Sequence, residues 1–166
     1  GYDSAGVAFH EGSKFSMARE TGRVKNLAKS VQEHSSTSSI GIAHTRWATH
    51  GAVTVSNTHP HISHDCKFVM VHNGVIENFG TLKRFLASKG IKFSSETDSE
   101  VLCNLIAYHY SLLSEGEDRF VDAIRQALPQ CRGAYGIAVL CLDYPDTMIG
   151  ARRGSPLVVG LGDDAN

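Results

Sequence analysis

Two short stretches of the sequence carry polar side chains of the kinds that bind and polarise small molecules. Residues 44–51 read HTRWATHG and residues 71–74 read VHNG. Each follows an apolar run that predicts a strand, and loops at strand ends are where a rigid scaffold usually presents functional groups. The Arg46 guanidinium suits a carboxylate, because it forms two parallel charge-assisted hydrogen bonds. The Asn73 amide beside the Gly74 N–H offers the two donors of an oxyanion hole.

Together these groups predict a site that holds a small carboxylate-bearing molecule and stabilises negative charge on a carbonyl oxygen, which is the chemistry of acyl transfer. Other interpretations compete. A single arginine is more often a surface residue, and Trp47 suits a core equally well. Asn-Gly between apolar runs is also the strongest short hairpin signal. Residues 75–78 lead into a predicted helix instead of a returning strand, which weakens the hairpin interpretation.

Length and composition narrow the class of protein. A chain of 166 residues predicts a single domain. A net charge of −1 argues against nucleic acid or an anionic membrane as the main partner. No run approaches the roughly eighteen apolar residues of a membrane span. The four cysteines form no CxxC pair, so we expect free thiols and a cytoplasmic protein; they are Cys66, Cys103, Cys131 and Cys141.

Hydrophobic periodicity predicts the order of the elements. We expect strands over residues 5–9, 14–20, 39–45, 68–73, 135–143, 147–152 and 157–161. We expect helices over residues 24–34, 78–89, 99–113 and 119–128. Residues 97–100, TDSE, have the spacing of a capping box. Residues 47–66 form a long irregular segment, in which Gly51 predicts a mobile flap over a ligand. These elements fit sheets covered by helices, without determining the architecture.

The histidines support a different function. Six of the nine lie between His44 and His72. Residues 59–61 and 64–66 supply imidazole, carboxylate and thiol groups at close spacing, which are zinc ligands. A His-rich metal-binding domain is therefore an alternative, although no HExxH or CxxC motif accompanies these residues and we assign no metal ligand. One tightly held zinc ion per chain would favour this alternative.

Residues 44–51 and 72–74 resemble the class II glutamine amidotransferase domain, an N-terminal-nucleophile hydrolase. Residues 1–6, 95–98, 132–136 and 154–157 extend the resemblance along the whole chain, toward the branch of the family that aminates fructose 6-phosphate. The resemblance implies an α+β fold, an αββα four-layer sandwich of two mostly antiparallel sheets. It implies one partial glutaminase domain over residues 1–166, glutamine as substrate, no cofactor, and a homodimeric parent whose sugar-isomerase domains bind fructose 6-phosphate outside this chain.

The resemblance also implies roles for individual residues. Asn73 and Gly74 donate to the oxyanion, Asp98 binds the α-amino group of glutamine, and Arg46 pairs with its α-carboxylate. The other substrate-binding residues are Trp47, Thr49 and His50. From its position alone, Asp98 equally fits the first turn of a helix, where the helix dipole favours a carboxylate.

In this family the nucleophile is a cysteine at the mature N-terminus, whose thiolate attacks the amide carbon of glutamine. None of the four cysteines of this sequence matches that position. We therefore expect a fold that is incomplete at its N-terminus, with one sheet lacking a strand, and a chain that hydrolyses no glutamine alone. A non-catalytic glutamine-binding module that kept the fold and lost the thiol is an open alternative.

Overall fold

The structure of the chain is a computed structural model that describes residues 3–32, 38–46 and 52–162. In this part of the chain the strands form two sheets whose ladders are antiparallel. The first has the order β2-β1-β3, with β1 Ser4–His10, β2 Phe15–Thr21 and β3 Gly41–Arg46. The second has the order β4-β5-β6-β7, with β4 His61–Ile62, β5 Phe68–Ile76, β6 Gly133–Cys141 and β7 Met148–Arg153. The helices are α1 Val24–Gln32, α2 Phe79–Ser88, α3 Asp98–Leu112 and α4 Arg119–Ala127, which continues as a 3₁₀ turn, Leu128–Gln130.

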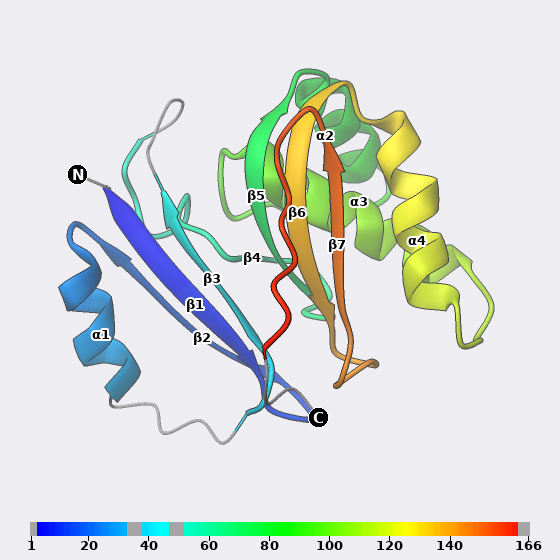
Figure 1. Cartoon of the computed structure of the whole chain (residues 1–166). Helices are drawn as coiled ribbons and strands as arrows, with labels where there is room; N and C mark the ends of the chain where they lie inside the picture. Colours follow the sequence, from blue (N-terminus) through cyan, green and yellow to red (C-terminus); the bar gives the residue numbers. More distant parts are fainter. Residues whose placement is uncertain (1–2, 33–37, 47–51, 163–166) are drawn as a thin grey trace.

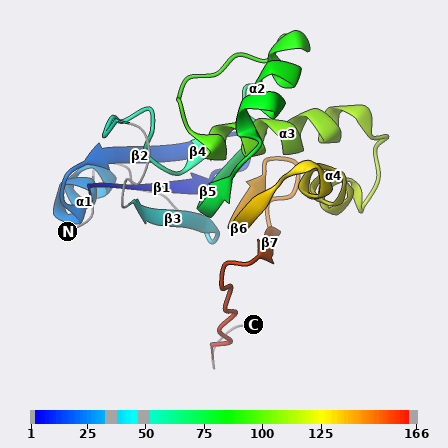
Figure 2. The ribbon, with the colours of Figure 1, turned by 90° about the horizontal axis from the view of Figure 1, so that it is seen from above.

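Side chains alternate between the two faces of each strand, and this alternation builds the layers. Ala8 and Ile42 of the first sheet meet Val69 and Leu140 of the second in a core between the sheets. The opposite face of the second sheet packs against α2, α3 and α4 in a larger core. Helix α1 packs against β1 and β2, so the sheets lie between α1 and the other three helices (Figures 1 and 2). The predicted αββα class is confirmed.

Helix α3 lies at the centre of the larger core, and its first turn is hydrogen-bonded to β5 through Asp98 and Ser99. Its N-cap is Thr97, whose side chain accepts a hydrogen bond from the Glu100 N–H at 3.2 Å, as the capping spacing predicts. The reciprocal half of the capping box is absent, because the Glu100 carboxylate bonds Ser94 and Ser95 instead. This network holds the first turn of α3, and therefore Asp98, in one place.

One strand is longer than the sequence indicates. Strand β5 continues through Asn73 and Gly74 to Ile76, so the prediction that the strand ends at residue 73 is wrong, as is the hairpin alternative. Gly74 has φ +136 and still pairs with Tyr135. A glycine adopts that backbone conformation without steric cost, so the ladder passes through a dipeptide that usually ends strands.

The prediction of a strand over residues 157–161 is also wrong. These residues have no regular secondary structure and pair with no described strand, and Val158, Val159 and Leu161 are exposed. Their apolar, β-branched composition suits a strand, but a strand forms only where another strand edge lies alongside. In Figure 2 this segment leads away from the body of the molecule.

The other predicted elements match the observed ones to within about two residues, the usual uncertainty of element ends. Strand β4, His61–Ile62, was not predicted, because it lies in the segment that the sequence indicates as irregular. Gly90 ends α2 with φ +86, as predicted. The predicted flap belongs to the segment 47–66, and its hinge at Gly51 lies outside the described residues, as does the predicted end of the first helix at His34. All four cysteines are free. No helix in the described part of the chain is long and apolar enough to cross a membrane.

Candidate functional site

Strands β3 and β5 bring the two predicted stretches together across the space between the sheets. His44 Nε2 on β3 lies 2.9 Å from Asn73 Oδ1 on β5. Arg46 follows His44 by two residues and therefore projects from the same face of β3, about 7 Å further along the strand. The guanidinium and the amide that the sequence predicts for one site thus lie on the same side of the molecule.

The Asn73-Gly74 dipeptide presents donors on an open stretch of β5. Hydrogen bonds from Leu142 N to Lys67 O and from Glu77 N to Arg132 O show that odd-numbered residues of β5 form the bonded pairs with β6. The Gly74 N–H therefore points away from β6. On that side β4 pairs only with Val69 and Met70, so the Gly74 N–H lies beyond the end of β4.

No residue other than glycine fits at position 74. A Cβ atom there would lie 2.1 Å from the carbonyl oxygen of Ala134 on β6, and φ is +136. The site is braced from the other side by the C-terminal part of the chain, since Ser155 Oγ donates to the Asn73 carbonyl oxygen at 3.2 Å. The sequence block at residues 154–157 thus contributes to the support of Asn73.

Asp98 approaches the same edge of β5. It is the first residue of α3, where the helix dipole favours a carboxylate, and its Oδ2 accepts a hydrogen bond from Ile76 N at 2.8 Å. Ile76 follows Gly74 by two residues, so both N–H groups face the side of β5 on which the Asp98 carboxylate lies. Asn73, Gly74 and Asp98 therefore converge on one edge.

Arg46 is a buried cation at the end of β3, with 6 % of its surface exposed. Its Nη1 donates to the carbonyl oxygen of Ala52 at 3.4 Å and lies 3.9 Å from Asp3 Oδ1. The guanidinium therefore already faces a carboxylate oxygen in this structure. Trp47, Thr49 and His50, the remaining predicted contacts, lie outside the described residues.

Behind these residues lies a histidine network whose role the sequence did not predict. The rings of His44 and His59 have centroids 4.3 Å apart. Ser99 Oγ, in the first turn of α3, lies 2.9 Å from both His59 Nε2 and His72 Nδ1. Gly6 makes room for this arrangement, because a Cβ at that position would lie 2.1 Å from the His59 carbonyl oxygen. In the sequence, His44 could have been recognised by its spacing of two residues from Arg46, which places both side chains on the same face of a strand.

Burial keeps these imidazoles neutral. Desolvation lowers the pKa of His44, a hydrogen bond with Asn73 opposes the shift, and the charge of Arg46 adds to it. Burial and the charges of Arg19 and Arg46 lower the pKa of His61 to about 3. Burial also lowers the pKa of His59 well below its usual range, and that of His72, where the charge of Asp98 opposes the shift. A neutral imidazole donates one hydrogen bond and accepts another.

The metal-binding alternative gains no support from this cluster. Across residues 3–32, 38–46 and 52–162, no group of three or more His, Cys, Asp or Glu side chains could hold a metal ion. Two of the imidazole nitrogens are bonded to hydroxyls, since His59 Nε2 bonds Ser99 and His61 Nε2 bonds Thr97 Oγ1 at 3.1 Å. The rings of His59 and His61 meet edge to face, with centroids 4.7 Å apart.

None of the four cysteines lies beside the donors of Asn73 and Gly74. Cys103, Cys131 and Cys141 are buried, and Cys66 is exposed in the turn before β5. Cys66 precedes the first residue of β5, and Asn73 is five residues further into that strand. At about 3.4 Å per residue, more than roughly 17 Å separates the thiol from the donors.

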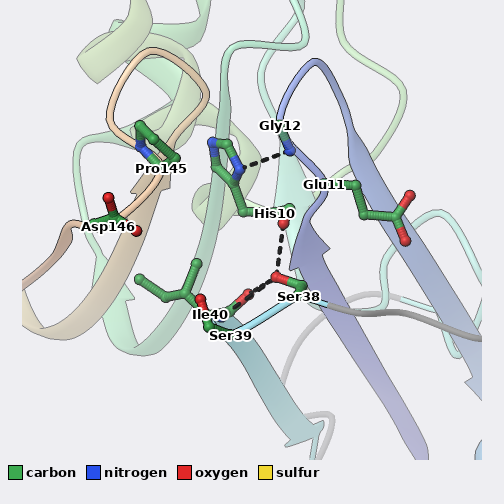
Figure 3. A pocket seen from close by; sticks show the side chains of 8 residues that line it. All are labelled: His10, Glu11, Gly12, Ser38, Ser39, Ile40, Pro145 and Asp146. Carbon is green, nitrogen blue, oxygen red and sulfur yellow. Dashed lines mark hydrogen bonds between the residues drawn. The ribbon is translucent and has the colours of Figure 1, made fainter. Parts of the chain in front are cut away.

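A cavity of about 450 Å³ lies at the other end of the first sheet (Figure 3). His10, the last residue of β1, lies in it between Glu11 and Asp146, with Ser38, Ile40 and Pro145 completing most of the lining. Because β1 pairs with β3 from Ser4 beside Arg46 to Phe9 beside Gly41, this cavity is a strand length away from Arg46. It is distinct from the site around Asn73.

Comparison with known proteins identifies the class. The family model described as "Glutamine amidotransferase domain" matches residues 7–120. Among solved structures, glutamine phosphoribosylpyrophosphate amidotransferase from B. subtilis superposes with a TM-score of 0.70 at 26 % identity, covering 92 % of this chain and 31 % of that one. A glutamine aminotransferase class-II domain protein from Silicibacter pomeroyi, at 21 % identity, shares the fold, with a TM-score of 0.58 and coverage of 94 % and 71 %. The chain therefore belongs to the glutamine amidotransferase domain family and has the fold of the N-terminal-nucleophile hydrolases.

Comparison with curated proteins shows more specifically which amidotransferases the chain is similar to. Over 166 residues and the whole of this chain, it is 47 % identical to the glutamine–fructose-6-phosphate aminotransferase [isomerizing] of Zymomonas mobilis and 45 % identical to that of Acinetobacter baylyi. The enzyme of the same name from Caldanaerobacter subterraneus is 42 % identical over the same length. The chain spans 26 % of the length of each of these relatives.

Proposed function

We propose that this domain binds glutamine at the edge of β5 and serves as the glutaminase part of an enzyme that supplies ammonia to fructose 6-phosphate. The observation that carries the proposal is the convergence of Asn73, Gly74 and Asp98 on one open strand edge, with Arg46 on the facing sheet. Glutamine has a carboxylate, an ammonium group and a side-chain amide, and each of these finds a complementary group here.

The Asn73 amide and the Gly74 N–H donate to the side-chain carbonyl oxygen of glutamine. Negative charge develops on that oxygen when the amide carbon is attacked, so the two donors lower the barrier by stabilising it. The loss of one such donor typically costs roughly 2.7–4 kcal/mol of activation free energy. Both donors are carried by a strand within a packed sheet, which keeps them in position without reorganisation.

The two charged groups of the amino acid are held at either side of those donors. The Asp98 carboxylate binds the α-ammonium group, and the Arg46 guanidinium binds the α-carboxylate through paired hydrogen bonds. The position of Asp3 near Arg46 supports the second assignment, because it shows that the guanidinium can face a carboxylate oxygen. Trp47, Thr49 and His50 complete the grip in this proposal.

The acceptor and the assembly follow from the relatives. The name of these relatives makes fructose 6-phosphate the acceptor of the ammonia, and we propose the same acceptor for the protein to which this domain belongs. We also expect a homodimer, which sedimentation of that protein would check. Because none of the four cysteines lies beside the oxyanion donors, we expect the 166-residue chain to bind glutamine weakly and to release no ammonia from it. A non-catalytic glutamine-binding module makes the same two predictions for this chain.

Calorimetric titration of the chain with L-glutamine tests the proposal. Arg46→Ala should weaken binding about 10- to 100-fold, since hydrogen bonds to charged groups contribute roughly 1.5–3 kcal/mol. Arg46→Lys keeps the charge without the planar fork and should bind with intermediate affinity. Arg84→Ala, an exposed arginine of α2, is the matched control and should leave binding unchanged. Equal affinity of wild type and a folded Arg46→Ala would show that the carboxylate clamp is wrongly assigned.

A further inference from the structure

His44 contacts the functional amide of the site directly, although nothing above gives it a role in binding. Its Nε2 lies 2.9 Å from Asn73 Oδ1, and this contact joins the two sheets. We propose that His44 is a positioning residue, whose Nε2–H holds Asn73 Oδ1 and thereby directs the Asn73 NH2 group toward the side-chain carbonyl of glutamine. The inference rests on the proposed function, because it assigns the Asn73 NH2 as a donor to that carbonyl.

The direction of the hydrogen bond follows from the proton inventory of the two side chains. An Asn amide can present either its oxygen or its NH2 group, and a neutral imidazole carries one proton on either nitrogen, so the surrounding network decides both. His44 Nδ1 is buried and has no hydrogen-bond partner among the residues that the structure describes. A proton on Nδ1 would leave a buried N–H without an acceptor. This costs about 1–2 kcal/mol, which makes the Nδ1–H tautomer roughly 5 to 30 times less populated than the Nε2–H tautomer. The proton therefore lies on Nε2, and Asn73 Oδ1 accepts it.

This assignment leaves the Asn73 NH2 group as the outward-facing part of the amide. Asn73 is exposed, and no residue that the structure describes accepts a hydrogen bond from its Nδ2. Rotation of the amide by half a turn would instead present Oδ1 to the carbonyl oxygen of the ligand, and two acceptors repel each other. The terminal torsion of Asn is broad and roughly two-fold, so only a specific contact selects one orientation.

The His44 ring is itself held in place by packing on the side away from Asn73. Its ring lies against that of His59, at a centroid separation of 4.3 Å, and Ser99 fixes His59 through its Nε2. Its cross-strand neighbour on β1 is Gly6, which has no side chain to displace it. The charge of Arg46 and burial both disfavour the imidazolium form of His44. The ring is therefore neutral and oriented before any ligand arrives.

Nitrogen NMR of the uniformly ¹⁵N-labelled chain tests the assignment without any ligand. Long-range ¹H–¹⁵N correlation spectra distinguish the two tautomers of a histidine. We expect the Nε2–H form at His44 in the range from pH 7 to pH 8. A His44 ring protonated at Nδ1, or fully protonated in that range, would overturn the proposal.

Titration with L-glutamine, followed by amide shifts, tests the consequence for binding. His44→Ala should weaken binding about 5- to 30-fold, which corresponds to the loss of 1–2 kcal/mol. His44→Gln places an NH2 donor near the position of Nε2 and should recover most of the affinity, which a purely structural role for the ring would not explain. His109→Ala removes a histidine from the last turn of α3, at the opposite end of that helix from Asp98, and serves as the control.

The outcomes separate this inference from the proposed function. If wild type shows no shifts at Asn73 and Gly74 on addition of L-glutamine, the proposed function fails, and the inference with it. If wild type binds and both His44 variants bind equally well, the proposed function stands and His44 has no positioning role. Loss of affinity in His44→Ala with recovery in His44→Gln supports the proposal. Loss in both variants, with both folded, would mean that the ring acts by packing alone and would overturn it.

Discussion

At the scale of single residues, the site depends on atoms that a strand would not normally expose. Asn73 and Gly74 lie inside β5, and the register with β6 turns the Gly74 N–H outward. The sequence predicted both residues as functional but placed them at the end of a strand. The reason is physical: Asn-Gly tolerates positive φ and so has the composition of a turn, whereas here the positive φ of Gly74 lets β5 pass close to Ala134.

Substitution of Gly74 tests this account at a single atom. Gly74→Ala should lower the free energy of unfolding by at least about 3 kcal/mol, because it adds backbone strain of roughly 1–3 kcal/mol to a collision with Ala134. Gly12→Ala is the matched control, since Gly12 also has positive φ (+74) but no atom lies within 4 Å of the added Cβ. Gly12→Ala should lower the free energy of unfolding by only about 1 kcal/mol. Urea denaturation of both variants measures the difference, and equal losses would show that strain alone matters.

At the scale of elements, the sequence predicted local features well and pairings poorly. Thr97 caps α3 and Gly90 ends α2, because caps depend on residues close in sequence. The contact between His44 and Asn73 depends on β3 facing β5 across 29 residues of sequence, which local periodicity does not reveal. Residues 157–161 have the composition of a strand without a described neighbour to pair with. Local propensity therefore predicted the helices and strands, whereas contacts between residues distant in sequence determined which strands pair with or face each other.

Helix α3 carries Asp98 into the site, and a buried carboxylate holds its first turn. Glu100 is 3 % exposed, and its two oxygens accept four hydrogen bonds, two each from Ser94 and Ser95 at 2.6–2.8 Å. Glu100→Gln replaces one acceptor oxygen by an NH2 donor that faces two other donors. We expect a loss of about 2–4 kcal/mol in the free energy of unfolding, because a buried unpaired donor costs roughly 1–3 kcal/mol.

The matched control for this variant is the exposed neighbour Glu96, whose side chain makes no hydrogen bond that the structure describes. Glu96→Gln should change stability by less than about 0.5 kcal/mol. Chemical denaturation followed by circular dichroism compares the two. If Glu100→Gln were as stable as Glu96→Gln, the carboxylate would not be what holds the first turn of α3.

At the scale of the whole molecule, the two sheets are joined by a core at one end and by buried imidazoles at the other. The core consists of Ala8, Ile42, Val69 and Leu140 with their neighbours. The imidazoles of His44, His59 and His72 lie near Asn73, and burial lowers the pKa of each. Polar groups thus replace apolar packing at the end that carries the candidate site, so we expect the association of the sheets to be sensitive to acid.

We predict that the free energy of unfolding falls as the pH is lowered from 6.5. Above that pH a histidine is neutral in both states and contributes nothing to the pH dependence. Below it the unfolded chain binds protons that the folded chain does not, so each strongly shifted histidine costs about 1.4 kcal/mol per pH unit. His59 and His61, the latter with its pKa of about 3, should together lower the free energy of unfolding by roughly 3–4 kcal/mol by pH 5.

Urea denaturation at pH 7, 6 and 5 measures this loss. His61→Gln should reduce the dependence by about one proton, which is about 1.4 kcal/mol per pH unit between pH 6 and pH 5. The lowered pKa of Asp143 acts only at more acid pH, near and below the usual range of a carboxyl group, so it does not contribute in this window. A free energy of unfolding that stays constant from pH 7 to pH 5 would contradict the neutral, buried state of the cluster.

The most direct measurement for the account as a whole is a map of backbone and side-chain amide shifts during titration of the ¹⁵N-labelled chain with L-glutamine. The account predicts saturable shifts at the Gly74 N–H, the Asn73 NH2 and the amide of Ile76, whose acceptor Asp98 would bind the ammonium group. Residues around the cavity at His10 should not shift. Saturable shifts confined to that cavity, or no shift at β5 at concentrations where glutamine binds, would contradict it.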